Sequence, residues 1–239
     1  MLENKKVIIF DLDGTLIDSI GVWNDIDIKL INTVGSIKFD NCNIGKIRDE
    51  KLKEYRNTPD AYLEYCGFLK NKYKSDKSKE EIKKLRYEIA DYYLENVIDY
   101  KKDAENVLKY LKEKGFILTI ASTTNENTIE KYRKYNKNII NKANFDDYFT
   151  LIYDKSSVKN IKPDPEVLYK TMDTLNVKKE ECIVLEDSLV GVEAAKNAGI
   201  DTLVMYDKYS DENRDKINKF SKLRFNNFTE LLDEIKKEV

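Results

Sequence analysis

The chain of 239 residues contains no histidine. This absence excludes Ser–His and Cys–His nucleophiles, histidine-ligated zinc and general acid–base catalysis by histidine. An enzyme of this composition has to work with carboxylates, lysine, hydroxyl groups and a metal ion that prefers oxygen ligands.

Cysteine and long apolar runs are also scarce. The three cysteines, Cys42, Cys66 and Cys182, are odd in number and widely spaced, which favours reduced thiols over a disulfide framework. No apolar stretch approaches the roughly 20 residues that span a bilayer. The early run Val7–Phe10 ends at Asp11 and lacks the profile of a signal peptide. We therefore expect a cytoplasmic protein without a membrane partner.

An excess of charge of either sign is missing as well. Lysine and arginine total 42, aspartate and glutamate total 44, and the formal net charge is −2. This balance gives no support for bulk attraction to nucleic acid or to an anionic membrane. With 41% hydrophobic residues, the chain has the composition of a globular protein, and it is long enough for one large domain or two unequal ones.

What the sequence does contain is an alternation of short apolar runs with amphipathic stretches of helical period. The predicted strands are Val7–Phe10, Phe116–Ala121, Cys182–Leu185 and Thr202–Met205. The predicted helices between them are Ala104–Glu113, Thr128–Tyr135, Glu166–Leu175 and Val190–Ala198. Continuous apolar runs are typical of parallel strands that are covered on both faces. The alternation predicts an α/β fold with a doubly wound parallel sheet, that is, a Rossmann-like core.

The segment from residue 17 to residue 100 differs from the rest. Its apolar residues recur with helical spacing, and it contains no convincing buried strand. The sequence Asn57-Thr58-Pro59-Asp60 marks a break and the start of a helix. We predict a helical cap domain at residues 17–100, inserted into a catalytic α/β core made of residues 1–16 and 101–239.

The strongest chemical signal is Asp11-Leu12-Asp13-Gly14-Thr15, directly after the first predicted strand. Ligands of open α/β sheets bind outside the carboxyl ends of the strands, which is where these two acids fall. Gly14 allows the chain to turn sharply and to approach a ligand closely. The structural alternatives are an ordinary turn and a calcium loop, and the calcium loop is not supported because no further acids follow at alternating positions.

Three further motifs follow predicted strands or lie just beyond them. The hydroxyl run Ser122-Thr123-Thr124 precedes a predicted helix, where it could bind an anion or simply cap the helix. Lys162 precedes a proline, and taken alone it reads as a solvated charge. Glu186-Asp187 closes an apolar run, where two adjacent acids would repel each other unless a cation or a lysine lay nearby. All these groups can converge on one crevice.

In this chain order the motifs Asp-x-Asp-Gly-Thr, strand-Ser, Lys-Pro and Glu-Asp resemble those of the haloacid dehalogenase superfamily, in its subgroup with a helical cap after the first strand. The run Glu186–Gly191 (Glu-Asp-Ser-x-x-Gly) is also similar to β-phosphoglucomutase-like members. The resemblance covers essentially the whole chain. It implies a magnesium-dependent phosphatase that acts on a small phosphorylated metabolite through an aspartyl-phosphate intermediate.

The resemblance and the chemistry of the side chains together imply a role for each acid. Asp11 is the expected nucleophile, and Asp13 the expected general acid and base. We expect Mg²⁺ to contact the carboxylate of Asp11, the backbone carbonyl of Asp13 and the carboxylate of Asp187. Glu186 is a candidate for its outer shell.

The remaining motifs are expected to bind the phosphoryl group. Its oxygens would contact Ser122 and the backbone of Thr123, and Lys162 would bridge Asp11 and the phosphoryl group as part of the catalytic set. The charge of Lys162 and of a divalent cation would offset the repulsion between two anions, which is about 4 kcal/mol at 4 Å in an environment of intermediate polarity.

Two other functions use the same fold. A mutase that moves phosphate between hydroxyls of a sugar phosphate would carry the same core motifs. We find no Gly-Val-Ser-Arg-like stretch of the sugar mutases in the cap, and residues 43–48 are a poor substitute, so hydrolysis is favoured. A non-catalytic phosphate-binding module would be expected to lack Asp11 or Asp13, and both are present. The identity of the substrate and the oligomeric state stay open.

Overall fold

The computed structural model describes residues 1–37, 39 and 43–238, so the prediction made for Cys42 lies outside the described residues. The other two cysteines, Cys66 and Cys182, are buried free thiols. The chain divides into two compact units. The larger unit comprises Met1–Ile20 and Ile98–Val239, and the smaller unit comprises Gly21–Val97, which interrupts the larger one in sequence.

The larger unit is built on a parallel sheet, which has six strands among the described residues. The strands are β1 (Val7–Phe10), β2 (Ile117–Ala121), β3 (Leu151–Tyr153), β4 (Cys182–Glu186), β5 (Asp201–Met205) and β6 (Arg224–Phe225). They lie in the order β3-β2-β1-β4-β5-β6. The order changes direction at β1, because β2 and β3 lie on one side of it and β4 to β6 on the other. Open α/β sheets bind ligands at such a switch point.

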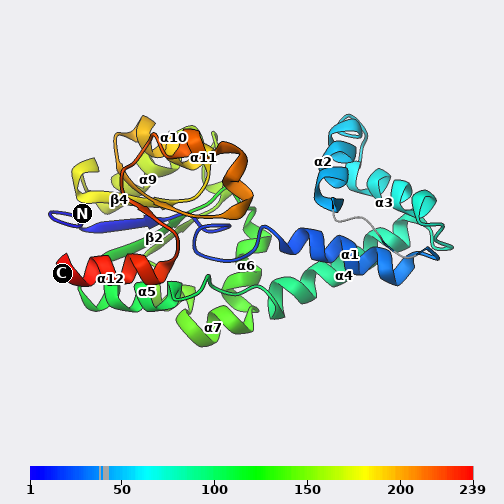
Figure 1. The fold of residues 1–239 in the computed structure, drawn as a ribbon, viewed down its shortest axis with the longest axis horizontal. Helices are drawn as coiled ribbons and strands as arrows, with labels where there is room; N and C mark the ends of the chain where they lie inside the picture. The colour runs from blue at the N-terminus through cyan, green and yellow to red at the C-terminus, as the bar shows by residue number, and fades with distance from the viewer. Residues whose placement is uncertain (38, 40–42, 239) are drawn as a thin grey trace. The chain divides into compact units, whose positions relative to one another are not determined.

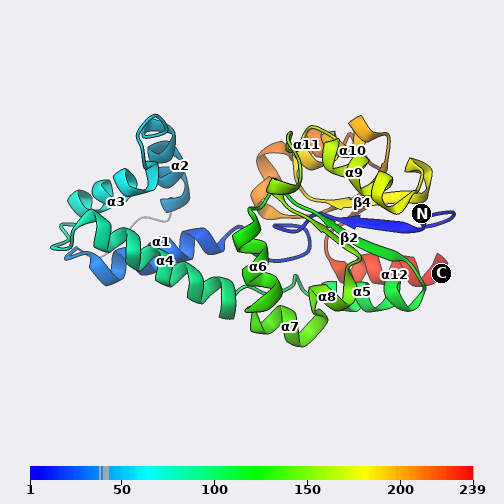
Figure 2. The same cartoon turned by 180° about the vertical axis from the view of Figure 1, so that it is seen from behind.

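Helices cover both faces of this sheet (Figure 1). One face carries α5 (Ala104–Glu113) and α12 (Phe228–Glu238), and the other carries α9 (Glu166–Leu175) and α10 (Leu189–Ala198). The view from behind shows α8 beside α5 (Figure 2). The remaining helices of this unit are α6 (Glu126–Lys134), α7 (Lys137–Ala143), α8 (Phe145–Tyr148), α11 (Arg214–Ile217) and the 3-10 turns η1 (Lys155–Ser157), η2 (Lys179–Glu181) and η3 (Lys208–Asn213).

The central strands are fully buried because they are apolar on both faces. All four side chains of β1 have no exposed surface, and β4 is buried along its whole length. Burial of each such aliphatic side chain stabilises the fold by about 1.5–3 kcal/mol. This layered core fixes the carboxyl ends of β1, β2 and β4 relative to one another.

The smaller unit is helical in its described part. Its helices are α1 (Val22–Val34), α2 (Ile44–Glu54), α3 (Ala61–Lys72) and α4 (Lys79–Asn96). Asp60 caps α3 by accepting from the backbone N–H of Leu63, and Ser78 and Glu81 form a capping box at the start of α4. The helices enclose their own apolar core, which includes Leu30, Tyr65, Leu69 and Ile82.

The predicted α/β fold with a doubly wound parallel sheet is confirmed. The predicted strands and helices are all present, with ends that differ by at most two residues. The sequence analysis missed β3 and β6, which contain three and two residues and are too short to give an apolar run. Within the part of the chain that the structure describes, no helix has the length and hydropathy needed to cross a membrane.

Candidate active site

Parallel register brings the ends of three strands to one level. Phe10 of β1 pairs with Ile120 of β2 and with Leu185 of β4. The backbone N–H of Asp11 continues the ladder by donating to the carbonyl of Leu185 at 2.9 Å. The residues at the end of each strand or just beyond it therefore lie at the same edge of the sheet, and they include Asp11, Ser122 and the Glu186-Asp187 pair.

Lys162 reaches this edge from the loop before α9 and joins two of the acids. Its ammonium lies 2.7 Å from Oδ1 of Asp11 and 2.6 Å from Oε1 of Glu186. Only 6% of Lys162 is exposed, so it is not the solvated lysine that its sequence context alone would suggest. Burial lowers the pKa of Lys162, but the negative charges of Asp11 and Glu186 outweigh it and raise the pKa above its ordinary value.

Asp11, Glu186 and Asp187 form a buried carboxylate cluster. One oxygen from each lies within 4.8 Å of the others. Burial raises the pKa of Asp11 well above its ordinary value, and the charge of Glu186 adds to the effect while Lys162 opposes it. Burial, followed by the charge of Glu186, raises the pKa of Asp187 to about 6. The three carboxylates outnumber the one ammonium among them, so the cluster has more acidic groups than positive charges to balance them.

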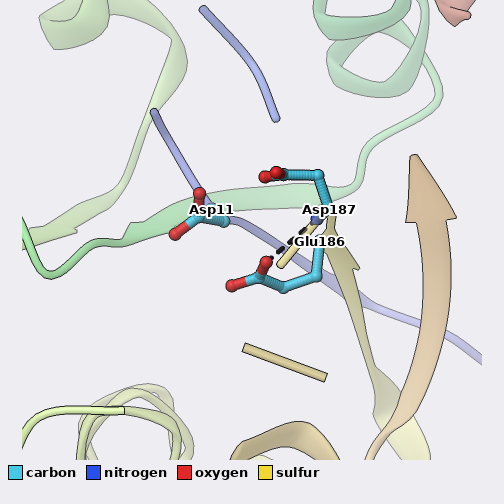
Figure 3. Close-up of side chains that lie close together, drawn as sticks. All are labelled: Asp11, Glu186 and Asp187. Atoms are coloured by element: carbon cyan, nitrogen blue, oxygen red, sulfur yellow. Dashed lines mark hydrogen bonds between the residues drawn. The ribbon is translucent and has the colours of Figure 1, made fainter. Parts of the chain in front are cut away.

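The two adjacent acids are held in different ways. Figure 3 shows their side chains leaving consecutive residues, with the backbone N–H of Asp187 donating to Oε2 of Glu186 at 2.9 Å. The same Oε2 accepts from the backbone N–H and the hydroxyl of Ser188, both at 3.0 Å. Among the described residues, the donors to the Asp187 side chain are the hydroxyls of Thr15 at 2.6 Å and of Ser210 at 3.0 Å. Glu186 thus has its oxygens occupied by strong donors, whereas Asp187 has no ion pair with a described residue.

Two glycines make room for these acids. Gly14 has a φ of +90°, and an added Cβ would lie 2.4 Å from Cδ1 of Ile20 and 3.0 Å from a carboxylate oxygen of Asp187. At Gly191, in the first turn of α10, an added Cβ would lie 1.7 Å from Oε1 of Glu186. The backbone of the site can therefore approach the carboxylates only because side chains are missing at these two positions.

Asp13 has a separate environment, although only one residue separates it from Asp11. It is partly exposed, and hydroxyl groups surround its carboxylate. Ser19 donates to Oδ1 at 2.5 Å, the hydroxyl of Tyr132 donates to the same oxygen at 3.2 Å, and Thr124 donates to Oδ2. Burial, and then the charge of Asp13, raises the pKa of Tyr132 well above its ordinary value, so this hydroxyl keeps its proton.

The hydroxyl run continues from β2 into the loop before α6. The backbone N–H of Ser122 donates to the carbonyl of Tyr153 on β3 at 2.9 Å, and Oγ of Ser122 accepts from the backbone N–H of Thr124 at 3.0 Å. Ser122 is buried, whereas Thr123 is exposed. The side chain of Asn125 caps α6. Capping is therefore done by Asn125, and the three hydroxyl residues lie before the helix.

Several residues of the site carried little or no signal in the sequence. Thr15 lies inside the first motif and Thr124 inside the hydroxyl run. The sequence therefore placed both residues near the site, but it did not predict which carboxylates they contact. Tyr132 and Ser210 had no such marker, since nothing near them in sequence points to Asp13 or Asp187. Only the three-dimensional structure brings these two hydroxyls to the carboxylates.

Comparison with known proteins identifies the family of the chain. Residues 8–205 match the sequence pattern of the family described as haloacid dehalogenase-like hydrolase. This chain belongs to that family. The match runs from β1 to the end of β5, so it covers Asp11, Asp13, Glu186 and Asp187 as well as the smaller helical unit.

Individual relatives of this haloacid dehalogenase-like chain cover most of its length. Phosphoglycolate phosphatase of Aquifex aeolicus is 32% identical over 204 residues, which are 82% of this chain and 83% of the relative. A phosphorylated carbohydrates phosphatase of Thermotoga maritima is 26% identical over 199 residues, or 83% of each chain. The crystal structure of a provisionally named beta-phosphoglucomutase from Thermotoga maritima has a TM-score of 0.74 at 23% identity, covering 98% of this chain and 100% of its own. At that identity the likeness concerns the fold alone.

Proposed function

We propose that this chain is a magnesium-dependent phosphatase that hydrolyses a small organic phosphate through an aspartyl-phosphate intermediate. The observation that carries the proposal is the contact of the Asp11 carboxylate with Lys162 inside a cluster of buried acids at the switch point of the sheet. A buried carboxylate beside a buried ammonium is a group that a protein can use as a nucleophile. Membership of a hydrolase family supports the same reaction class.

The reaction has two steps, and their atoms balance. In the first, a carboxylate oxygen of Asp11 forms a bond to phosphorus, the bond from phosphorus to the ester oxygen breaks, and Asp13 gives its proton to that oxygen. In the second, Asp13 takes a proton from water, the water oxygen bonds to phosphorus, and the bond to Asp11 breaks. Inorganic phosphate leaves, and both carboxyl groups return to their first state.

Lys162, Ser122 and Thr123 bind the phosphoryl group in this proposal. The Lys162 ammonium contacts Asp11 and would place its charge between the nucleophile and an incoming phosphoryl oxygen. Ser122 directly follows β2, as Asp11 directly follows the neighbouring strand β1. Thr123 is the next residue and is exposed, and we assign its backbone N–H to the same phosphoryl group.

The carboxylate cluster has the donor chemistry that Mg²⁺ prefers. Its oxygens are hard ligands, and its acids exceed its lysine in number, so a divalent cation would supply the missing positive charge. Asp11, the backbone carbonyl of Asp13 and Asp187 would hold the ion directly. Glu186 would act from the outer shell, because Lys162 and the donors of residues 187 and 188 already occupy its oxygens. The ion would neutralise charge on the phosphoryl group.

The substrate class follows from the relatives. Two curated relatives that align with more than four fifths of this chain are named as phosphatases, one of phosphoglycolate and one of phosphorylated carbohydrates. We therefore propose a small phosphorylated metabolite as substrate. A mutase remains the nearest alternative, but the likeness to a named mutase is a likeness of fold, and the relatives above 25% identity point to hydrolysis.

The test is phosphate release from a panel of esters in the presence of Mg²⁺ or of a chelator. The panel contains phosphoglycolate, several sugar phosphates and p-nitrophenyl phosphate. Wild type is expected to release phosphate only with the metal, and Asp11→Asn is expected to be inactive. Asp173→Asn removes an exposed carboxylate on α9 and should keep full activity. Turnover that survives in Asp11→Asn would overturn the proposal, and isomerisation of glucose 1-phosphate without phosphate release would favour the mutase.

A further inference from the structure

Hydroxyl groups from three separate segments hold the carboxylate of Asp13. Ser19 follows the first motif, Thr124 follows β2, and Tyr132 lies on α6, and all of them belong to the larger unit. Asp13 forms no ion pair with a described residue, in contrast to Asp11, which contacts Lys162. The acid–base residue of the proposed reaction is thus oriented by neutral donors.

The donors are divided unequally between the two oxygens of Asp13. A carboxylate oxygen has about two lone pairs that can accept hydrogen bonds. Oδ1 accepts from both Ser19 and Tyr132, so both of its sites are occupied. Among the described residues, Thr124 is the one donor to Oδ2, which leaves a second site on this oxygen for a proton.

Tyr132 is the most deeply buried of these donors. Its side chain has no exposed surface, and it lies one turn after the buried Thr128 on the same face of α6. The helix is fixed at its start by the Asn125 cap. The terminal torsion of an aspartate is broad and nearly two-fold, so the backbone alone does not decide which oxygen faces which way. A donor at a fixed point can decide it.

We propose that Tyr132 is a positioning residue for the reaction: its hydroxyl, together with that of Ser19, holds Oδ1 of Asp13 so that Oδ2 exchanges the proton with the ester oxygen and with water. The inference rests on the proposed phosphatase function. It goes beyond that function because it assigns a purpose to a buried tyrosine that does not itself touch the reacting atoms.

Tyr132→Phe removes the hydroxyl and keeps the ring. The readout is kcat/KM for two esters that differ in their need for a proton, phosphoglycolate with its basic alkoxide and p-nitrophenyl phosphate with its weakly basic phenolate. General acid–base catalysis contributes roughly 10²–10⁴-fold, so partial misalignment of Asp13 should lower kcat/KM for phosphoglycolate by about tenfold or more. The value for p-nitrophenyl phosphate should fall less than about threefold, since its leaving group departs without help.

A matched control is Tyr100→Phe, which removes a buried hydroxyl that donates to the carbonyl of Ala143, away from Asp13. Its effect, if any, should be equal on both esters. An equal loss on both esters in Tyr132→Phe, or no loss on either, would overturn the inference. Crystal structures of wild type and Tyr132→Phe add a readout that needs no turnover. A wild type inactive on every ester would overturn the proposed function, and an unchanged Asp13 carboxylate in the variant would overturn the positioning role by itself.

Discussion

The ammonium of Lys162 lies 2.7 Å from Oδ1 of Asp11, although 151 residues separate the two in the chain. Both groups are buried, and the second contact of Lys162, to Glu186 at 2.6 Å, links it to the neighbouring strand end. The pair connects β1, the loop before α9 and the end of β4. The charges of this pair therefore contribute both to the stability of the fold and to the reaction that we propose.

Replacing Lys162 with methionine should separate those two contributions. The variant keeps the unbranched side chain as far as the Cε position but leaves Asp11 and Glu186 without their ammonium. Breaking a buried pair in this way costs about 3–5 kcal/mol when no cation replaces the charge. We expect kcat to fall by about 100-fold or more, with lower stability in denaturant titrations. Lys159→Met, at an exposed position of the same loop, should match wild type in both assays. Full activity in Lys162→Met would contradict its assignment to the phosphoryl group.

The contact between Gly191 and Glu186 can be tested with a single methyl group. In Gly191→Ala the new Cβ would lie 1.7 Å from Oε1 of Glu186, so the glutamate has to move away from Lys162. We expect a loss of about 1–3 kcal/mol in the free energy of unfolding, together with lower activity.

The matched control for this substitution is Gly67→Ala, within α3. Its Cβ would meet only the side chain of Lys79, at 3.5 Å. Alanine is the better helix former, so this variant should gain about 0.5–1 kcal/mol. Thermal unfolding measured by calorimetry distinguishes the two, and a Gly191→Ala protein as stable and active as wild type would show that Glu186 needs no fixed position.

The raised pKa of Asp187 should make stability depend on pH in the metal-free protein. Its pKa is 3.8 in the unfolded reference and about 6 in the fold. Between these two pKa values the unfolded chain has already lost the proton while the folded chain still holds it. The free energy of unfolding therefore falls as the pH rises from about 4 to 6. Above pH 6 the total loss is on the order of 3 kcal/mol.

Denaturant titrations of wild type and Asp187→Asn in chelator measure this contribution. The variant lacks the penalty, so its stability relative to wild type should increase across that pH window and then stay constant. Asp173→Asn, with its exposed carboxylate, should follow wild type at every pH. Parallel curves for wild type and Asp187→Asn would mean that burial of this acid carries no such cost.

Magnesium binding should be visible without turnover. A ligand that binds only the folded state stabilises it by about 2.7 kcal/mol at 100 times its dissociation constant. Mg²⁺ is therefore expected to raise the Tm of wild type, and a chelator to reverse the rise. Asp187→Asn should lose most of this shift. Asp13→Asn should keep it, because we assign only the backbone carbonyl of Asp13 to the metal, and loss of the shift in that variant would contradict the assignment.

The sequence predicts most of the fold because the central strands are unbroken apolar runs. β1 and α5 begin and end where the apolar pattern predicts, and α9 does so as well. The apolar pattern does not predict β3 and β6, because these strands are very short. Their positions depend on pairing with β2 and β5 rather than on their own residues. Local patterns cannot report such tertiary pairing.

Some residues of the site could likewise be predicted from the sequence, and others could not. Asp11, Asp13 and the Glu186-Asp187 pair follow predicted strands directly, so parallel topology alone places them at one edge. Lys162 was marked by its place among the motifs, and its burial and two ion pairs appear only in three dimensions. Tyr132 reaches Asp13 across 119 residues of sequence from a helix with no motif, and no local signal could have pointed to it.

The central claim is that Asp11 becomes phosphorylated, and trapping the intermediate tests it most directly. Enzyme turning over p-nitrophenyl phosphate in Mg²⁺ is quenched in acid, reduced with borohydride and digested, and the peptide that contains Asp11 is analysed by mass spectrometry. Borohydride converts an acyl phosphate of aspartate to homoserine, so the account predicts homoserine at position 11 in wild type and none in Asp11→Asn. Rapid phosphate release with an unmodified Asp11, or with the modification at another acid, would contradict it.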